Sequence, residues 1–167
     1  MKPPPLLPEE IFQRVLRVAR FDGLSVLVVA GLFALLAAAM GDYVGAIIGV
    51  LVAGAGAIEL HGVTLLRHGA PRGMRWLIGS QFFLMLSVLA YCALRLAHPE
   101  LAPMRAAVTD EMKAQLEVIG WSVEQFTGLV YRITYVAVAI ATVIYQGGMA
   151  FYYQRRRGAV TSALAAE

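Results

Sequence analysis

The chain has 167 residues, enough for one domain, and 59% of them are hydrophobic while only 15% are charged. Soluble domains are about half apolar and about a quarter charged, so this composition, with a mean hydropathy of +0.68, excludes an ordinary soluble protein. A single cysteine excludes a disulfide scaffold and any multi-cysteine metal or cluster site. The formal net charge is +3, but we interpret the arginines as determinants of membrane topology and expect no nucleic-acid partner.

Four stretches are long and apolar enough to cross the roughly 30 Å hydrocarbon core of a bilayer. They cover about residues 24–40, 43–66, 76–94 and 127–153. The expected fold is therefore all-α, an integral membrane four-helix bundle. Residues 37–39 resemble a signal-peptide cleavage site, but the first apolar run is at the long end for a signal peptide and a second span follows closely. We therefore treat the first run as a membrane span.

Lys and Arg indicate the orientation, because cytoplasmic loops are enriched in both. With both termini in the cytoplasm, ten of the fourteen lie inside: Lys2, Arg14, Arg17, Arg20, Arg67, Arg72, Arg75, Arg155, Arg156 and Arg157. The chain then divides into an N-terminal cytoplasmic segment (1–20), a four-span domain (21–157) and a flexible cytoplasmic tail (158–167). Short extramembrane segments and the absence of organelle signals favour a bacterial inner membrane, where anionic lipid headgroups would contact the cytoplasmic face.

Two amphipathic helices are expected to lie on the membrane surface. In the N-terminal segment one face carries Ile11, Phe12, Val15, Leu16 and Ala19. The second helix, over about 101–119, lies in the outer loop between the third and fourth spans. It is expected to connect two spans, and the alternative is a lid over the bundle.

Small residues predict close helix packing, because membrane helices associate where small side chains let backbones approach. The second span carries a strip at four-residue spacing, and so does the first: Gly45, Gly49, Ala53 and Ala57, then Ala30, Ala34 and Ala38. The pattern leaves open whether the strips face the chain's own bundle, a second copy or another membrane protein.

Polar side chains gather in one layer of the inner leaflet. Glu59 lies about 12 Å from the span end at Arg67, and Gln81 about 9 Å from Arg75. His61, Tyr145 and Gln146 fall near the same depth. One interpretation is a structural layer in which Glu59 is protonated and hydrogen-bonded to a glutamine, since an uncompensated carboxylate in low dielectric tends to stay neutral. The other is a proton- or cation-binding site with Glu59 as the titrating group.

Glu59 and His61 are two residues apart and project from nearly opposite sides of a helix, so we do not expect a direct dyad. The spacing of the histidines does not suit bis-histidine haem, and no metal-ligand motif is present, so we predict no metal and no cofactor. Tyrosines near the span ends, Tyr152 and Tyr153 among them, are assigned to the headgroup level.

At the outer end Arg132 is expected near the membrane interface, where it either snorkels or pairs with Asp42 or Glu124, and we favour pairing. Arg95 is interpreted as a routine flanking charge. The chain has no phosphate-binding glycine loop and no nucleophile with a base, so an enzyme is not expected. The sequence favours a small non-enzymatic membrane protein with a structural or accessory role through helix association. The alternative is an oligomeric ion, proton or solute pathway, a channel or transporter.

Overall fold

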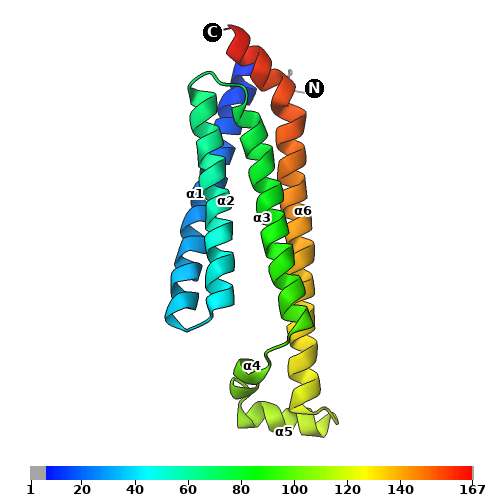
Figure 1. Ribbon diagram of the computed structural model, residues 1–167. Helices are drawn as coiled ribbons and strands as arrows, with labels where there is room; N and C mark the ends of the chain where they lie inside the picture. Colours follow the sequence, from blue (N-terminus) through cyan, green and yellow to red (C-terminus); the bar gives the residue numbers. More distant parts are fainter. Residues whose placement is uncertain (1–6, 167) are drawn as a thin grey trace, which may run out of the picture.

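The computed structural model describes residues 7–166, and within that range it is helical with no strand (Figure 1). Its helices are α1 (Pro8–Ala39), α2 (Tyr43–Arg67), α3 (Gly73–Ala97), α4 (Ala102–Ala106), α5 (Asp110–Val118) and α6 (Val123–Ala166). Four of them, α1, α2, α3 and α6, are long and apolar enough to cross a membrane, which indicates a multi-pass membrane protein. Lys2 and the rest of residues 1–6, part of the predicted N-terminal segment, lie outside the described residues.

The long helices form a four-helix arrangement in which successive neighbours are α1, α2, α3 and α6, with α6 returning to α1. Figure 1 shows both ends of the chain at one end of the bundle, here called the termini end. At the opposite, loop end, α3 and α6 extend beyond the α1–α2 hairpin to the short helices α4 and α5. The interface between α1 and α6 is the smallest of the four.

The predicted N-terminal surface helix and first span are one continuous helix in the structure, because no residue between them ends α1. Its apolar face does not turn toward lipid. Phe12, Val15, Leu16 and Ala19 instead pack into the main hydrophobic core, which lies at the termini end and includes residues of α2, α3 and α6. The separation predicted near residue 20 is therefore corrected to an uninterrupted helix of 32 residues.

The outer helix predicted over 101–119 is two helices, α4 and α5. The break follows from a capping residue, because the Thr109 side chain accepts a hydrogen bond from the Met112 backbone N–H and begins α5 there. At the other end of the chain, the predicted tail over 158–167 is helical to Ala166. Val160 and Ala163 are buried in the core, which explains why α6 continues past the arginines.

Two glycines shape the hairpin turns between the long helices. Gly41 (φ 77°) follows α1 and Gly69 (φ 71°) follows α2, in the left-handed region that glycine adopts without strain. After Gly41 the Asp42 N–H reaches the Ala37 carbonyl at 2.9 Å, and after Gly69 the Ala70 N–H reaches the Leu65 carbonyl at 3.0 Å. Both helices therefore end in Schellman-type turns that allow the chain to reverse within a few residues.

Small residues bring α1 and α2 together along their length. Gly49 lies against the backbone and side chain of Ala34, and Gly56 lies against the Gly23 carbonyl and the Leu27 N–H. These small-residue contacts lie within the chain's own bundle. Ala57, predicted to extend the strip, is exposed, because the buried face of α2 turns toward Glu59, Gly62 and Val63.

We predict that Gly56→Ala lowers the free energy of unfolding by about 1–3 kcal/mol, because the added Cβ meets backbone that cannot move aside. It would lie 2.7 Å from the Gly23 carbonyl oxygen and 2.8 Å from the Leu27 nitrogen. Gly54→Ala is the matched control, since a Cβ there meets nothing within 4 Å. Unfolding of both variants in the same detergent is the measurement, and equal losses would contradict this packing.

Candidate functional site

The polar cluster contains two buried carboxyl groups, Asp22 of α1 and Glu59 of α2, which are 6% and 1% exposed. The Tyr153 hydroxyl donates to Glu59 Oε1 at 2.6 Å. The Tyr145 hydroxyl donates to Asp22 Oδ1 at 2.8 Å, and Gln81 Nε2 donates to Asp22 Oδ2 at 3.2 Å. All four long helices thus meet at these two acids. The cluster defined by these five residues is called the carboxyl cluster below.

The close approach of α1 and α2 places the two acids together. Gly23, next to Asp22, lies so near α2 that a Cβ there would be 3.3 Å from the Glu59 Cβ and 3.1 Å from the Gly56 carbonyl oxygen. The glycines of this contact therefore determine the spacing of the acids.

No cation neutralises the carboxyl cluster within residues 7–166. The ion pairs of this range join Arg95 to Asp42 and Glu100, Arg105 to Glu124, and Lys113 to Asp110, all at the loop end or in α5. Hydroxyl and amide groups supply every hydrogen bond that the structure gives to Asp22 and Glu59. A buried carboxylate pair without a counter-charge is costly, which favours a bound proton or cation.

The cluster also has unused hydrogen-bonding capacity. Gln81 is 1% exposed, yet its Oε1 has no donor, and the buried Gln146 Oε1 also lacks one. Ser80, beside Gln81, donates to the Leu77 carbonyl of its own helix instead of to the cluster. Buried amide oxygens without a partner are uncommon in native proteins, so this layer is only partly satisfied by the chain itself.

The structure brings together some of the residues predicted for the polar layer and separates others. Glu59, Gln81 and Tyr145 all take part in the carboxyl cluster. Gln146 is buried on the same side of α6 as Tyr153, although no hydrogen bond ties it to the acids. His61 is exposed and lies edge-on against Trp76, with ring centroids 5.3 Å apart, so it belongs to a different face of α2.

Sequence reasoning missed Asp22 and Tyr153 as members of the site. Asp22 is only two residues before the predicted start of the first span, and the continuity of α1 brings it inside the bundle. Tyr153 was expected at the headgroup level, yet it is fully buried. Helical spacing contained the signal, since Gln146, Ala150 and Tyr153 share one face and all three are buried.

At the loop end, the pairing predicted for Arg132 is wrong. Asp42 binds Arg95 at 2.6 Å and also caps α2 by accepting from the Gly45 N–H at 3.0 Å, while Glu124 pairs with Arg105. Arg95 was interpreted as a flanking charge, but it forms two ion pairs at the loop end. Its second partner is Glu100, at 2.8 Å. Arg132 is exposed and lies on a surface groove beside Trp121. Arg95 Nε donates to the hydroxyl of Tyr91, four residues earlier on the same face of α3, at 3.2 Å. This hydrogen bond helps to hold the Arg95 side chain on the face of α3 beside the hairpin tip.

Within residues 7–166 no group of three or more His, Cys, Asp or Glu side chains is placed to hold a metal ion. Comparison with protein-family models, with characterised proteins and with solved structures finds no match to this chain.

We predict that Tyr153→Phe lowers the free energy of unfolding by about 1–3 kcal/mol, because it leaves the buried Glu59 Oε1 without its donor. The neighbouring Tyr152→Phe is the control. The Tyr152 hydroxyl is buried without a hydrogen-bond partner, so its removal should be neutral or stabilising. Thermal unfolding of both variants in one detergent distinguishes them, and a harmless Tyr153→Phe would contradict a structural bond to Glu59.

We predict that Arg95→Gln lowers the free energy of unfolding by about 1 kcal/mol, because it removes the ion pair with Asp42 that joins the α1–α2 hairpin to α3 and the pair with Glu100 that follows α3. Arg132→Gln removes the same charge from the same end and should change stability by less than about 0.5 kcal/mol. Denaturation at low and high salt is the measurement. Losses of equal size in the two variants would mean that net charge, not pairing, explains the effect.

Proposed function

We propose that this chain is a small ion or proton pathway of a membrane, a channel or transporter, in which the carboxyl cluster binds and releases a proton or a monovalent cation. The observation that carries the proposal is the pair Asp22 and Glu59, buried between four membrane-length helices with no cationic partner in residues 7–166. Intramembrane acids are costly and are kept in general for ion and proton pathways. The proposal includes no chemical reaction, and we propose no enzymatic activity.

The hydrogen bonds favour different roles for the two acids. Asp22 accepts a donor on each carboxyl oxygen, from Tyr145 and Gln81. Glu59 accepts one donor, from Tyr153. The titratable groups that face the pair are these two tyrosines of α6, while α3 contributes only neutral groups. Glu59 is therefore the proposed site of the exchanging proton, and a monovalent cation would bind to the same oxygens.

A groove at the loop end supports an access route from that side. Its volume is about 890 Å³, and it lies between the tip of the α1–α2 hairpin and helices α3, α4 and α6, with Asp42, Arg95 and Tyr135 among its lining residues. Tyr135 precedes Tyr145 by ten residues, about 15 Å along α6, so the groove ends short of the cluster. Exchange then requires the helices to move apart, and the small α1–α6 interface is the proposed place.

The proposed orientation has both termini in the cytoplasm. It is supported by the sequence, because ten of the fourteen Lys and Arg residues then lie on the cytoplasmic side. In this orientation the loop-end groove faces outward. A bacterial inner membrane is the proposed location, because the extramembrane segments are short.

A structural or accessory role is the second candidate, and two observations favour it. Hydrogen bonds in the carboxyl cluster join α6 to both α1 and α2, as expected for a layer that determines helix register. In addition, no residue of α6 between Tyr131 and Gln146 is buried within the chain, which leaves this stretch for lipid, a second copy or another membrane protein. This role predicts no transport.

Flux into liposomes distinguishes the two candidates. The full chain is reconstituted with a dye sensitive to protons, sodium or potassium trapped inside, and the gradient of the matching ion is imposed in each case. We expect flux above empty liposomes for one of these ions, and a fall of at least about tenfold in Glu59→Gln and Asp22→Asn, because each variant removes a titratable oxygen pair. Glu117→Gln, an exposed acid of α5, is the matched control and should transport like the wild type.

Two results would contradict the pathway. Transport that survives in Glu59→Gln would remove the carboxyl cluster from the route. Absence of flux in the wild type under every gradient would leave the cluster as a structural element, and crosslinking along α6 in native membranes would then test for a partner. Thermal unfolding of each variant shows whether lost transport reflects lost folding.

A further inference from the structure

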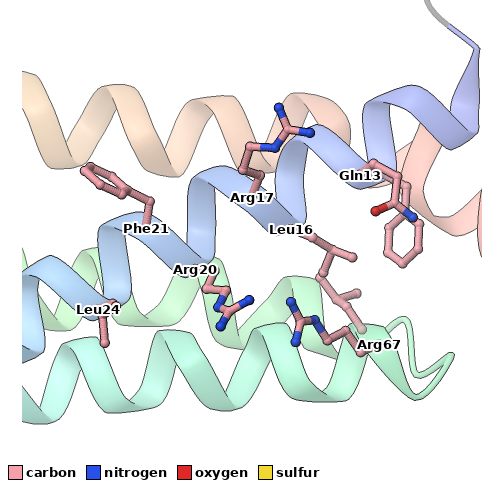
Figure 2. Close-up of a pocket in the computed structure, with 9 residues that line it drawn as sticks. Gln13, Leu16, Arg17, Arg20, Phe21, Leu24 and Arg67 are labelled. Atoms are coloured by element: carbon pink, nitrogen blue, oxygen red, sulfur yellow. The ribbon is translucent and has the colours of Figure 1, made fainter.

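A second charged site lies at the termini end, on the outside of the α1–α2 pair. It is a groove of about 690 Å³ between these helices, and its lining combines three arginines with apolar side chains (Figure 2). Arg17 and Arg20 come from α1 and Arg67 from the last turn of α2. This groove is separate from the carboxyl cluster, whose residues do not line it.

Two of the arginines converge on one place. Figure 2 shows the Arg20 side chain leaning toward the end of α2 and the Arg67 side chain turning back toward Arg20, so their guanidinium groups face the same space between the helices. Arg17 extends from the other side of α1. Two guanidinium groups held in this way present several N–H donors to one anion, and phosphate oxygens match that geometry.

None of these arginines is neutralised by the described part of the chain, residues 7–166. The ion pairs in that range do not include Arg17, Arg20 or Arg67. The acids nearest in sequence have other contacts: Glu9 accepts from Gln13, Glu10 accepts from the Leu7 N–H, and Asp22 faces inward to the carboxyl cluster. The groove therefore has a net positive charge and free donors.

The surroundings of the arginines select among anions. Exposed Phe21 and Leu24 line the groove on the side of the apolar run of α1, and Leu66 forms part of its wall. Arg67 ends the apolar run of α2, so the guanidinium groups lie where the hydrocarbon meets the headgroups. A soluble phosphate would use only the charged half of this groove, whereas a phospholipid would use both halves.

We propose that the groove between α1 and α2 binds one anionic phospholipid, with its phosphate between Arg20 and Arg67 and an acyl chain along Phe21 and Leu24. The site is distinct from the general attraction of basic residues to anionic headgroups, because it depends on two arginines on different helices and on an apolar wall beside them. The negative headgroup adds charge complementarity that a zwitterionic lipid lacks. This inference does not rest on the proposed transport function.

Native mass spectrometry of the full chain, released from micelles with phosphatidylglycerol and phosphatidylcholine at equal concentration, tests the site. We expect one retained phosphatidylglycerol per chain and binding weaker by at least about tenfold in Arg20→Gln/Arg67→Gln, because two charge-assisted contacts are lost. The double variant Arg155→Gln/Arg157→Gln is the matched control, since it removes two exposed arginines elsewhere in the cytoplasmic set and none of the groove. It should retain lipid as the wild type does.

Three results would overturn the proposal. Equal losses in the two double variants would mean that total charge, not the groove, retains the lipid. Equal retention of phosphatidylcholine would mean that the arginines do not select an anionic headgroup. Displacement of phosphatidylglycerol by millimolar inorganic phosphate would assign the groove to a soluble anion. Circular dichroism and thermal unfolding of each variant confirm that a folded protein is compared.

Discussion

The contact between Gly23 of α1 and Gly56 of α2 is the constraint on which the rest of the structure depends. Because neither residue has a Cβ, the helix backbones approach until Gly23 lies against the Glu59 side chain. Asp22 and Glu59 then share one buried space, although they are 37 positions apart in the chain. A larger side chain at either glycine would separate the acids and the helices together. The tight hairpin supplies both carboxyl groups, while α3 and α6 complete the site with neutral donors.

Asp42, at the loop end, is a structural carboxylate with which Asp22 and Glu59 can be compared. Asp42 caps α2 and pairs with Arg95, so its charge is neutralised where it is needed to hold the hairpin. Asp22 and Glu59 receive hydroxyl and amide groups in place of a cation, and the nearby Gln81 Oε1 has no donor. A polar layer required only for helix register would be more stable if its carboxyl charges were neutralised or if every buried polar atom had a hydrogen-bond partner. The incomplete neutralisation is the property that a reversible proton or cation site requires.

Hydrophobic length predicted the four membrane helices, and depth along them brought Glu59, Gln81 and Tyr145 to one layer. Hydropathy could not predict the other members of the carboxyl cluster, nor the ion pairs at the loop end. Asp22 and Tyr153 sit near charged residues at the span ends, where a hydropathy pattern cannot tell a buried side chain from one at the headgroups. The partner of an arginine also depends on tertiary packing. Arg95 and Arg132 both lie near the loop-end limits of predicted spans, and only the packing of the hairpin against α3 brings Asp42 to Arg95. The break between α4 and α5 depends on the capping side chain of Thr109, and α6 continues beyond its arginines because later residues are buried. Hydropathy does not report either kind of contact.

The two proposed sites lie on the same pair of helices, α1 and α2. Arg20 and Asp22 are two residues apart on α1, where Arg20 lines the groove outside the α1–α2 pair and Asp22 faces the carboxyl cluster. Unneutralised guanidinium groups there repel a proton or cation that approaches the acids from this side. A bound phospholipid phosphate cancels that repulsion without supplying a counter-ion to the acids themselves. The two proposals together therefore predict faster exchange between the carboxyl cluster and the termini side when the groove holds a phospholipid.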